Sequence, residues 1–302
     1  MPADRVAYSA IGERPVLRWP NDARVALWVV PNLEHYEYLP GPSPALDPWP
    51  RSPHPDVPGY STRDYGNRVG VWRLFEAFDR LGITATVAFN VGAFEHYPEL
   101  FTACEARGYD YLCHGIYNTR YHWGMSPPEE RAEIADCVES FRRISGRTFD
   151  GWFTPFLSPT LHTPDLVAAA GISYYCDWVF DDQPFPLRVQ EGRLLAMPYS
   201  VDVNDAVVYR QGFEAAEFAR VITDHFAVLH RDGLATGRVM CVALHPYISG
   251  QPHWIDHVAR ALEEIVSRDG VWVATGSEIA AWYYATMWDA IQVHLGETDA
   301  GS

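Results

Sequence analysis

The stretch Arg24-Val-Ala-Leu-Trp-Val-Val-Pro31 is an apolar run of strand length that is rich in β-branched residues. Its apolar side chains are consecutive, whereas a strand with one face in water alternates apolar and polar residues. Consecutive apolar residues are typical of a strand that is buried on both faces in a parallel sheet. We therefore predict such a strand over residues 24–31, and its partners have to come from the rest of the chain.

Similar units follow one another along the remaining sequence. Apolar runs of strand length stand at residues 83–89, 109–113, 151–154, 172–176, 194–199, 239–244 and 271–273. Predicted helices separate them at residues 69–81, 97–107, 126–144, 164–170, 213–229 and 255–267, and Ser277 is placed to cap a last helix. This alternation predicts an α/β fold with a parallel sheet. Since no Gly-x-Gly-x-x-Gly follows the first strand and no Walker A motif occurs, a nearly closed (β/α) barrel of about seven strands is favoured over a nucleotide-binding fold.

Two segments stand outside this alternation. Residues 1–23 have no clear period and are interpreted as an arm that lies on the domain. Residues 38–60 contain eight prolines, which predict neither a helix nor a central strand. A long irregular loop of this kind is typical of a lid or pocket wall, and a solvated insertion is the alternative. No stretch resembles a linker, so we predict one barrel domain over residues 1–302.

Composition narrows the possible partners. The 302 residues include 23 Lys and Arg against 39 Asp and Glu, for a formal net charge of −16. An acidic surface repels phosphates, so neither nucleic acid nor an anionic membrane is expected as a partner. No apolar run approaches the ~20 residues that span a bilayer, and the first residues do not resemble a signal peptide. The five cysteines form no CxxC pair, which suggests free thiols in a reducing cytoplasm.

Polar residues stand directly after several predicted strands. In an α/β barrel, active-site residues lie at the carboxyl ends of the strands. Glu34 follows the first predicted strand, His114 follows residues 109–113, and His245 follows residues 239–244. We expect these three side chains to converge on one mouth of the barrel.

Four motifs, in chain order, resemble the polysaccharide-deacetylase-like (NodB-homology) superfamily: Asn32-Leu-Glu34, His114-Gly-Ile-Tyr-Asn118, Thr154-Pro-Phe156 and Leu244-His245. The resemblance implies a distorted (β/α) barrel. Metal-dependent members hold a divalent metal with an aspartate and two histidines. This chain has Asn118 where the second histidine stands and lacks the arginine of the third motif. Because an amide is a poor zinc ligand compared with imidazole, a standard zinc esterase site is not expected.

Two longer stretches resemble one subgroup of that superfamily, the metal-independent allantoinases and cyclic imide hydrolases. They are Arg63-Asp-Tyr-Gly-Asn-Arg-Val-Gly-Val-Trp-Arg73 and Pro198-Tyr-Ser-Val-Asp-Val-Asn-Asp205, and the likeness extends over residues 24–282. The subgroup implies hydrolysis of a C–N bond in a small cyclic amide or imide. It further implies no cofactor, no metal, and a homo-oligomer, with a tetramer suspected.

Opening such a ring needs an activated water, a group that stabilises the oxyanion, and a proton for the leaving nitrogen. Glu34 is the candidate general base; the alternative is an exposed carboxylate or a partner for Arg68. His114 and His245 are candidates for orienting water, stabilising the oxyanion or protonating nitrogen, and the alternative is a structural histidine. The candidate substrate-binding residues are Asn118, Tyr117, Asp64, Arg68, Thr154, Trp178, Tyr199 and Asn204. Asp64 is equally well placed as a helix N-cap.

Two other function classes remain open. One is a divalent-metal-dependent N-deacetylase acting on an N-acetylated sugar, with an atypical site. The other is a barrel that has lost catalysis and only binds a ligand. Retention of Glu34, His114 and His245 together disfavours the second class.

Overall fold

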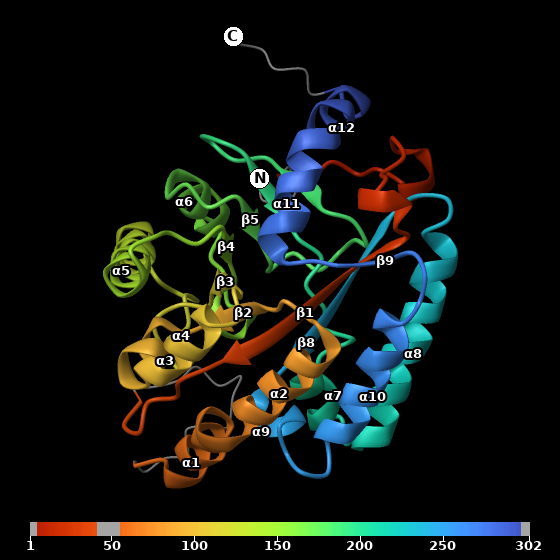
Figure 1. Cartoon of the computed structure of the whole chain (residues 1–302). Helices are drawn as coiled ribbons and strands as arrows, with labels where there is room; N and C mark the ends of the chain where they lie inside the picture. Colours follow the sequence, from red (N-terminus) through yellow and green to blue (C-terminus); the bar gives the residue numbers. More distant parts are fainter. Residues whose placement is uncertain (1–4, 41–54, 297–302) are drawn as a thin grey trace.

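The computed structural model describes residues 5–40 and 55–296, and in these residues nine strands form one sheet (Figure 1). The strands are β1 (Val25–Leu33), β2 (Thr86–Phe89), β3 (Asp110–Cys113), β4 (Gly151–Trp152), β5 (Tyr174–Tyr175), β6 (Phe185–Leu187), β7 (Leu194–Ala196), β8 (Arg238–Leu244) and β9 (Val271–Val273). They lie in the order β6-β7-β5-β4-β3-β2-β1-β8, with β9 paired to β1. The neighbours pair in parallel, except that β6 and β7 are antiparallel.

The long strand β1 organises the sheet. β8 pairs with it from Val25 to Pro31, while β9 and then β2 pair with its first and last residues. Past β7, the chain returns to β8 through a single parallel bridge between Asn204 and Ala243. The sheet is therefore curled into a distorted (β/α) barrel, and the predicted fold class is confirmed. The nine strands exceed the predicted number of about seven. The eight apolar runs correspond to β1–β5 and β7–β9, and the additional antiparallel β6 is three residues long and contains Pro186, so it leaves little sequence signal.

Twelve α-helices occur in the described ranges: α1 (Val57–Tyr65), α2 (Val71–Leu81), α3 (Val91–His96), α4 (Pro98–Glu105), α5 (Pro127–Ser145), α6 (Thr163–Ala169), α7 (Asp205–Arg210), α8 (Ala215–Asp232), α9 (Pro246–Ser249), α10 (Ile255–Val266), α11 (Gly276–Thr286) and α12 (Trp288–His294). Helices α2, α8 and α10 lie along β1 and β8 on the outer face of the sheet (Figure 1). The start of α11 contacts the amino ends of β2 and β3. The backbone N–H of Gly276 donates a hydrogen bond to the hydroxyl of Thr86, and that of Ser277 donates to the carboxylate of Asp110.

The core has two layers because β1 is buried on both faces, as predicted. Val25, Leu27 and Val29 join the cluster between sheet and outer helices, and Ala26, Trp28 and Val30 join the cluster inside the curl. All five cysteines are free and buried in these layers. Within the described residues, no helix has the length and apolarity that crossing a membrane requires.

The structure corrects three predictions about element ends. Residues 41–54 of the predicted loop at 38–60 lie outside the described residues, but its last residues are helical, because α1 begins at Val57. Pro58 stands in the first turn of α1, where a missing N–H breaks no helical bond. Asp64 is not an N-cap, since Asp56 caps α1 through the N–H of Gly59. Thr275, not Ser277, caps α11. The division into a single domain over residues 1–302 stays a prediction.

Candidate active site

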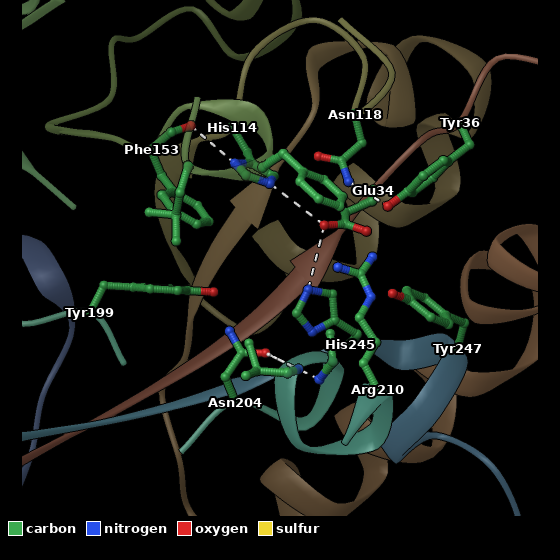
Figure 2. Close-up of a pocket in the computed structure, with 14 residues that line it drawn as sticks. Glu34, Tyr36, His114, Asn118, Phe153, Tyr199, Asn204, Arg210, His245 and Tyr247 are labelled. Atoms are coloured by element: carbon green, nitrogen blue, oxygen red, sulfur yellow. Dashed lines mark hydrogen bonds and ion pairs between the residues drawn. The ribbon is translucent and has the colours of Figure 1, made fainter. Parts of the chain in front are cut away.

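Three side chains meet at the carboxyl edge of the sheet, each directly after a strand. Glu34 follows β1, His114 follows β3 and His245 follows β8 (Figure 2). The Oε1 atom of Glu34 lies 3.5 Å from Nε2 of His114 and 3.5 Å from Nε2 of His245. All three side chains are buried. The sequence-based expectation that they converge is therefore met in the structure.

His114 is held in a single orientation by its surroundings. Its backbone N–H donates to the carbonyl of Phe89, and its ring lies flat on the ring of Phe153 at a centroid distance of 4.3 Å. Its Nδ1 atom is 3.0 Å from the carbonyl oxygen of Phe153. Because a carbonyl can only accept, Nδ1 carries the hydrogen, and Nε2 faces the Glu34 carboxylate.

His245 is held between two carboxylates. Its Nδ1 atom lies 2.6 Å from Oδ1 of Asp205, the first residue of α7, and its backbone N–H donates to Oδ2 of the same carboxylate at 2.7 Å. The hydroxyl of Ser249 also donates to that Oδ2 at 2.5 Å. Burial lowers the pKa of His245, but the charges of Glu34 and Asp205 and their hydrogen bonds raise it to about 10. His245 is therefore an imidazolium at neutral pH.

Glu34 has one engaged and one unengaged oxygen. Burial raises the pKa of its carboxyl, but the charge of His245 and the hydrogen bonds of both histidines outweigh burial and hold that pKa well below its usual range. Glu34 is therefore ionised at neutral pH. Its Oε2 atom is buried and has no hydrogen-bond partner among the described residues. A buried carboxylate oxygen in this state is ready to accept a hydrogen bond from a bound water or ligand.

A second unengaged acceptor belongs to Asn118. Its backbone N–H donates to the carbonyl of His35, and its Nδ2 donates to the hydroxyl of Tyr36 at 2.6 Å. In the part of the chain that the structure describes, Oδ1 of Asn118 is buried without a partner. The site thus offers two acceptors, on Glu34 and Asn118, to a ligand that carries N–H or O–H groups.

These groups line a cavity of about 190 Å³. Its remaining wall is largely aromatic and aliphatic, and it contains Tyr36, Phe153, Phe156, Leu157, Tyr199, Asn204, Ala206, Val207, Arg210 and Tyr247. Phe156 and Leu157 have left-handed φ angles of 62° and 52°, which few residues other than glycine adopt. The guanidinium of Arg210 lies 4.8 Å from the ring centroid of Phe156 and adds a positive charge to the lining of the cavity.

Six of the predicted site residues line this cavity: Glu34, His114, His245, Asn118, Tyr199 and Asn204. Tyr199 donates its hydroxyl to Oδ1 of Asn32 and packs on Phe153. Asn204 also caps α7, since its Oδ1 accepts the N–H groups of Ala206 and Val207. The alternative interpretation of Glu34 as an exposed carboxylate or a partner for Arg68 is wrong, because Glu34 is 6% exposed and Arg68 pairs with Asp64.

The other five predicted residues do not line this cavity. Tyr117 and Arg68 line a separate hollow together with His35 and Glu37. His35 and Glu37 alternate with Glu34 and Tyr36 along the chain, so this hollow lies on the opposite side of that segment from the cavity. Asp64 accepts hydrogen bonds from Tyr97 and Arg68 beside that hollow.

Trp178 lines a third hollow beside α6. Thr154 is buried, and its N–H and hydroxyl both donate to Asp177.

Sequence reasoning missed several residues of the site. Tyr36 could have been found, since it stands two positions after Glu34 and so shares its side of an extended chain. Asp205 ends the motif at residues 198–205, and the sequence does not reveal that its carboxylate holds His245. Phe153, Phe156, Arg210 and Tyr247 reach the cavity through loops and short helices whose paths the sequence pattern does not specify.

The residues present do not fit a divalent-metal site. Across residues 5–40 and 55–296 there is no group of three or more His, Cys, Asp or Glu side chains arranged to hold a metal ion. The position that resembles the second histidine of the family motif is Asn118, whose Nδ2 hydrogen is directed at Tyr36. Nε2 of His245 carries a proton in this arrangement, and a metal would have to displace that proton to bind there.

Comparisons with known proteins agree with this fold. A sequence model of the polysaccharide deacetylase family matches residues 52–175. A Schizosaccharomyces pombe protein named "Putative polysaccharide deacetylase" is 29% identical over 298 residues, which cover 87% of this chain and 92% of that protein.

Two crystal structures are also similar over most of their length. A structure of Puue allantoinase aligns with a TM-score of 0.82 and 25% identity, covering 93% of this chain and 99% of that one. A structure of a probable polysaccharide deacetylase from Pseudomonas aeruginosa PAO1 aligns with a TM-score of 0.80 and 26% identity, covering 90% of this chain and 95% of that one.

Proposed function

We propose that this chain, which belongs to the polysaccharide-deacetylase-like (NodB-homology) superfamily, opens a C–N bond of a small cyclic amide or imide without a metal. The observation that carries the proposal is Glu34, a buried carboxylate between two histidines with one oxygen unengaged in a small cavity. The likeness to an allantoinase structure supports it.

The size of the cavity favours a single small ring. Pockets for drug-sized ligands measure about 300–1,000 Å³, whereas this cavity is about 190 Å³. The two unengaged acceptors, Glu34 Oε2 and Asn118 Oδ1, suit a ligand rich in N–H groups together with a bound water.

Glu34 and His245 can together supply the proton transfers that hydrolysis of the ring requires. Glu34 takes a proton from a water bound at Oε2, and the water oxygen forms a bond to the ring carbonyl carbon. The C–N bond then breaks, and Nε2 of His245 gives its proton to the leaving nitrogen. The proton that Glu34 took from water then passes to His245, whose Nε2 lies 3.5 Å from Oε1 of Glu34, and both groups regain their starting protonation states. This return is favourable, because the pKa of His245 is about 10 while that of Glu34 lies well below its usual range.

The test of this proposal is an absorbance assay with chelator-treated protein. Succinimide, glutarimide, hydantoin, dihydrouracil and allantoin are offered in turn, and loss of the ring is followed. We expect at least one ring to be opened at the same rate before and after chelation, because no step uses a metal.

Two results of this assay would contradict the proposal. If rings are opened only after zinc, manganese or cobalt is restored, the metal-free mechanism is wrong. If no ring is opened and N-acetylated sugars are deacetylated with added metal, the protein is a metal-dependent deacetylase. Deacetylation is the activity that the matching family model names.

A homo-oligomeric state and a cytoplasmic location stay predictions.

The pH dependence follows from the two coupled groups. Glu34 has to be ionised and His245 protonated; the pKa of Glu34 lies below its usual range and that of His245 is about 10. We expect kcat/KM to be flat across neutral pH and to fall as the pH rises through about 10.

Stability shares the alkaline limit. The raised pKa of His245 contributes stability that is full below its ordinary value of 6.5 and is lost as the pH rises through about 10. The lowered pKa of Glu34 contributes stability that is full above 4.5 and is lost as the pH falls toward the folded value. A pH–rate profile and thermal unfolding at several pH values check this, and an alkaline limb near 6.5 would contradict it.

A further inference from the structure

Tyr36 lines the cavity but has no role in the proton transfers described above. It stands two residues after Glu34, its ring is 7% exposed, and its hydroxyl points into the space beside the Glu34 carboxylate and Asn118 (Figure 2). Ring opening passes through a tetrahedral intermediate whose carbonyl oxygen becomes negative. Such an oxygen needs a hydrogen-bond donor that is fixed in place before the reaction.

The hydroxyl hydrogen of Tyr36 is available for that purpose. The Tyr36 oxygen accepts the Nδ2 hydrogen of Asn118 at 2.6 Å, so its own hydrogen is directed elsewhere. Glu34 Oε2, in the same cavity, receives no hydrogen bond from any described residue. The Tyr36 hydrogen therefore has no protein acceptor within the described ranges, and a bound substrate oxygen can take it.

The positive charge of Arg63 lies over the ring of Tyr36. Its guanidinium carbon lies 4.7 Å from the ring centroid of Tyr36 and 5.3 Å from that of Tyr247. Burial raises the pKa of Tyr36 well above its ordinary value, so the hydroxyl keeps its hydrogen throughout the working range. The charge of Arg63 acts in the opposite direction on that pKa, which makes the O–H a more polar donor.

Resting on the proposed ring opening, we propose that the Tyr36 hydroxyl is the catalytic donor that stabilises the oxyanion, with Arg63 and Asn118 as its positioning residues. The carbonyl oxygen of the ring would face Tyr36, while the attacking water sits at Glu34 Oε2. This arrangement separates the donor to the oxyanion from His245, which delivers its proton to nitrogen. The substrate class follows: a ring carbonyl next to a scissile nitrogen, small enough for both ends to be held at once.

The first test is Tyr36→Phe, measured on whichever ring the wild-type protein opens. We expect kcat to fall by about 10²- to 10³-fold, as for loss of one oxyanion donor, with KM changed by less than about threefold because the contact strengthens in the transition state. Tyr109→Phe is the matched control, since Tyr109 is also buried and its hydroxyl has no partner in the described structure. It lies at the amino end of β3, away from the cavity, and its activity should match the wild type.

Arg63 is tested by a double-mutant cycle. Arg63→Met keeps a long apolar side chain but removes the charge, and we expect kcat to fall by about tenfold or more. Arg63→Lys should recover part of that loss. If Arg63 acts through Tyr36, the loss caused by Arg63→Met should shrink in the Tyr36→Phe background, whereas a purely structural role would give additive losses.

Each outcome separates this inference from the proposed function. Normal kcat in a folded Tyr36→Phe protein overturns the oxyanion assignment while ring opening by the wild type stands. A loss confined to Tyr247→Phe would move the donor to Tyr247 and also overturn it. Absence of any ring opening by the wild-type protein refutes the proposed function itself.

Discussion

Glu34→Gln is expected to lower kcat/KM for ring opening by about 10²- to 10⁴-fold while the protein stays folded. Glutamine has nearly the same shape, but it cannot take a proton from water. The change also removes a negative charge that holds His245 in its protonated form. The residual activity should therefore show an alkaline limit at lower pH than the wild type.

The control for this variant is Glu37→Gln. Glu37 stands three residues further along, and its carboxylate pairs with Thr119 and Arg120 on the other side of the segment. Circular dichroism and thermal unfolding report folding for both variants, and steady-state rates report activity. Near-normal turnover by a folded Glu34→Gln protein would rule out Glu34 as the general base.

The second large effect is expected for Asp205→Asn. Asp205 is fully buried and accepts three hydrogen bonds, from the backbone and Nδ1 of His245 and from Ser249. An asparagine offers one acceptor in place of two and leaves the His245 imidazolium with one carboxylate fewer. We expect a loss of about 3–5 kcal/mol in the free energy of unfolding, as for breaking a buried ion pair. The activity per folded molecule should fall by about 10²- to 10⁴-fold, since His245 loses its fixed orientation and proton.

Asp110→Asn separates stability from catalysis. Asp110 is at the opposite end of the sheet, where it accepts hydrogen bonds from Thr86 and Ser277. It should leave the activity per folded molecule unchanged, whatever change it makes in the free energy of unfolding. If Asp205→Asn changed only the free energy of unfolding, Asp205 would be a structural residue. The proposal that His245 protonates the leaving nitrogen would then lose its support.

The fold was predictable where the local pattern is strong. The consecutive apolar residues of 24–31 correctly predicted a strand with both faces buried, because only a central strand of a layered fold tolerates them. The start of the predicted helix at residues 126–144 was also predictable, because Glu129 follows Ser126 by three residues, and in the structure it accepts hydrogen bonds from the serine N–H and hydroxyl. The antiparallel β6 was not predictable, because its pairing with β7 is specified by tertiary contacts rather than by its three residues.

The candidate site was predictable where its residues directly follow parallel strands. Glu34, His114 and His245 each follow a parallel strand, and parallel strands bring their carboxyl ends to one edge. Their meeting at one point therefore needed no knowledge of side-chain geometry. Tyr117 and Asn118 show the limit, since these neighbours enter different hollows. That difference depends on how the loop after β3 turns, which sequence spacing does not reveal.

By itself, the sequence determined the order of strands and helices, the parallel sheet and the strand ends where polar groups gather, because hydrophobic burial and backbone hydrogen bonding act on local patterns. Tertiary structure alone decided what those groups do. It placed Asp205 behind His245, so that an ordinary histidine becomes an imidazolium with a pKa of about 10. It also left Oε2 of Glu34 unengaged in the cavity. Charge and solvation depend on distances between residues far apart in the chain, and those distances exist only in the folded protein.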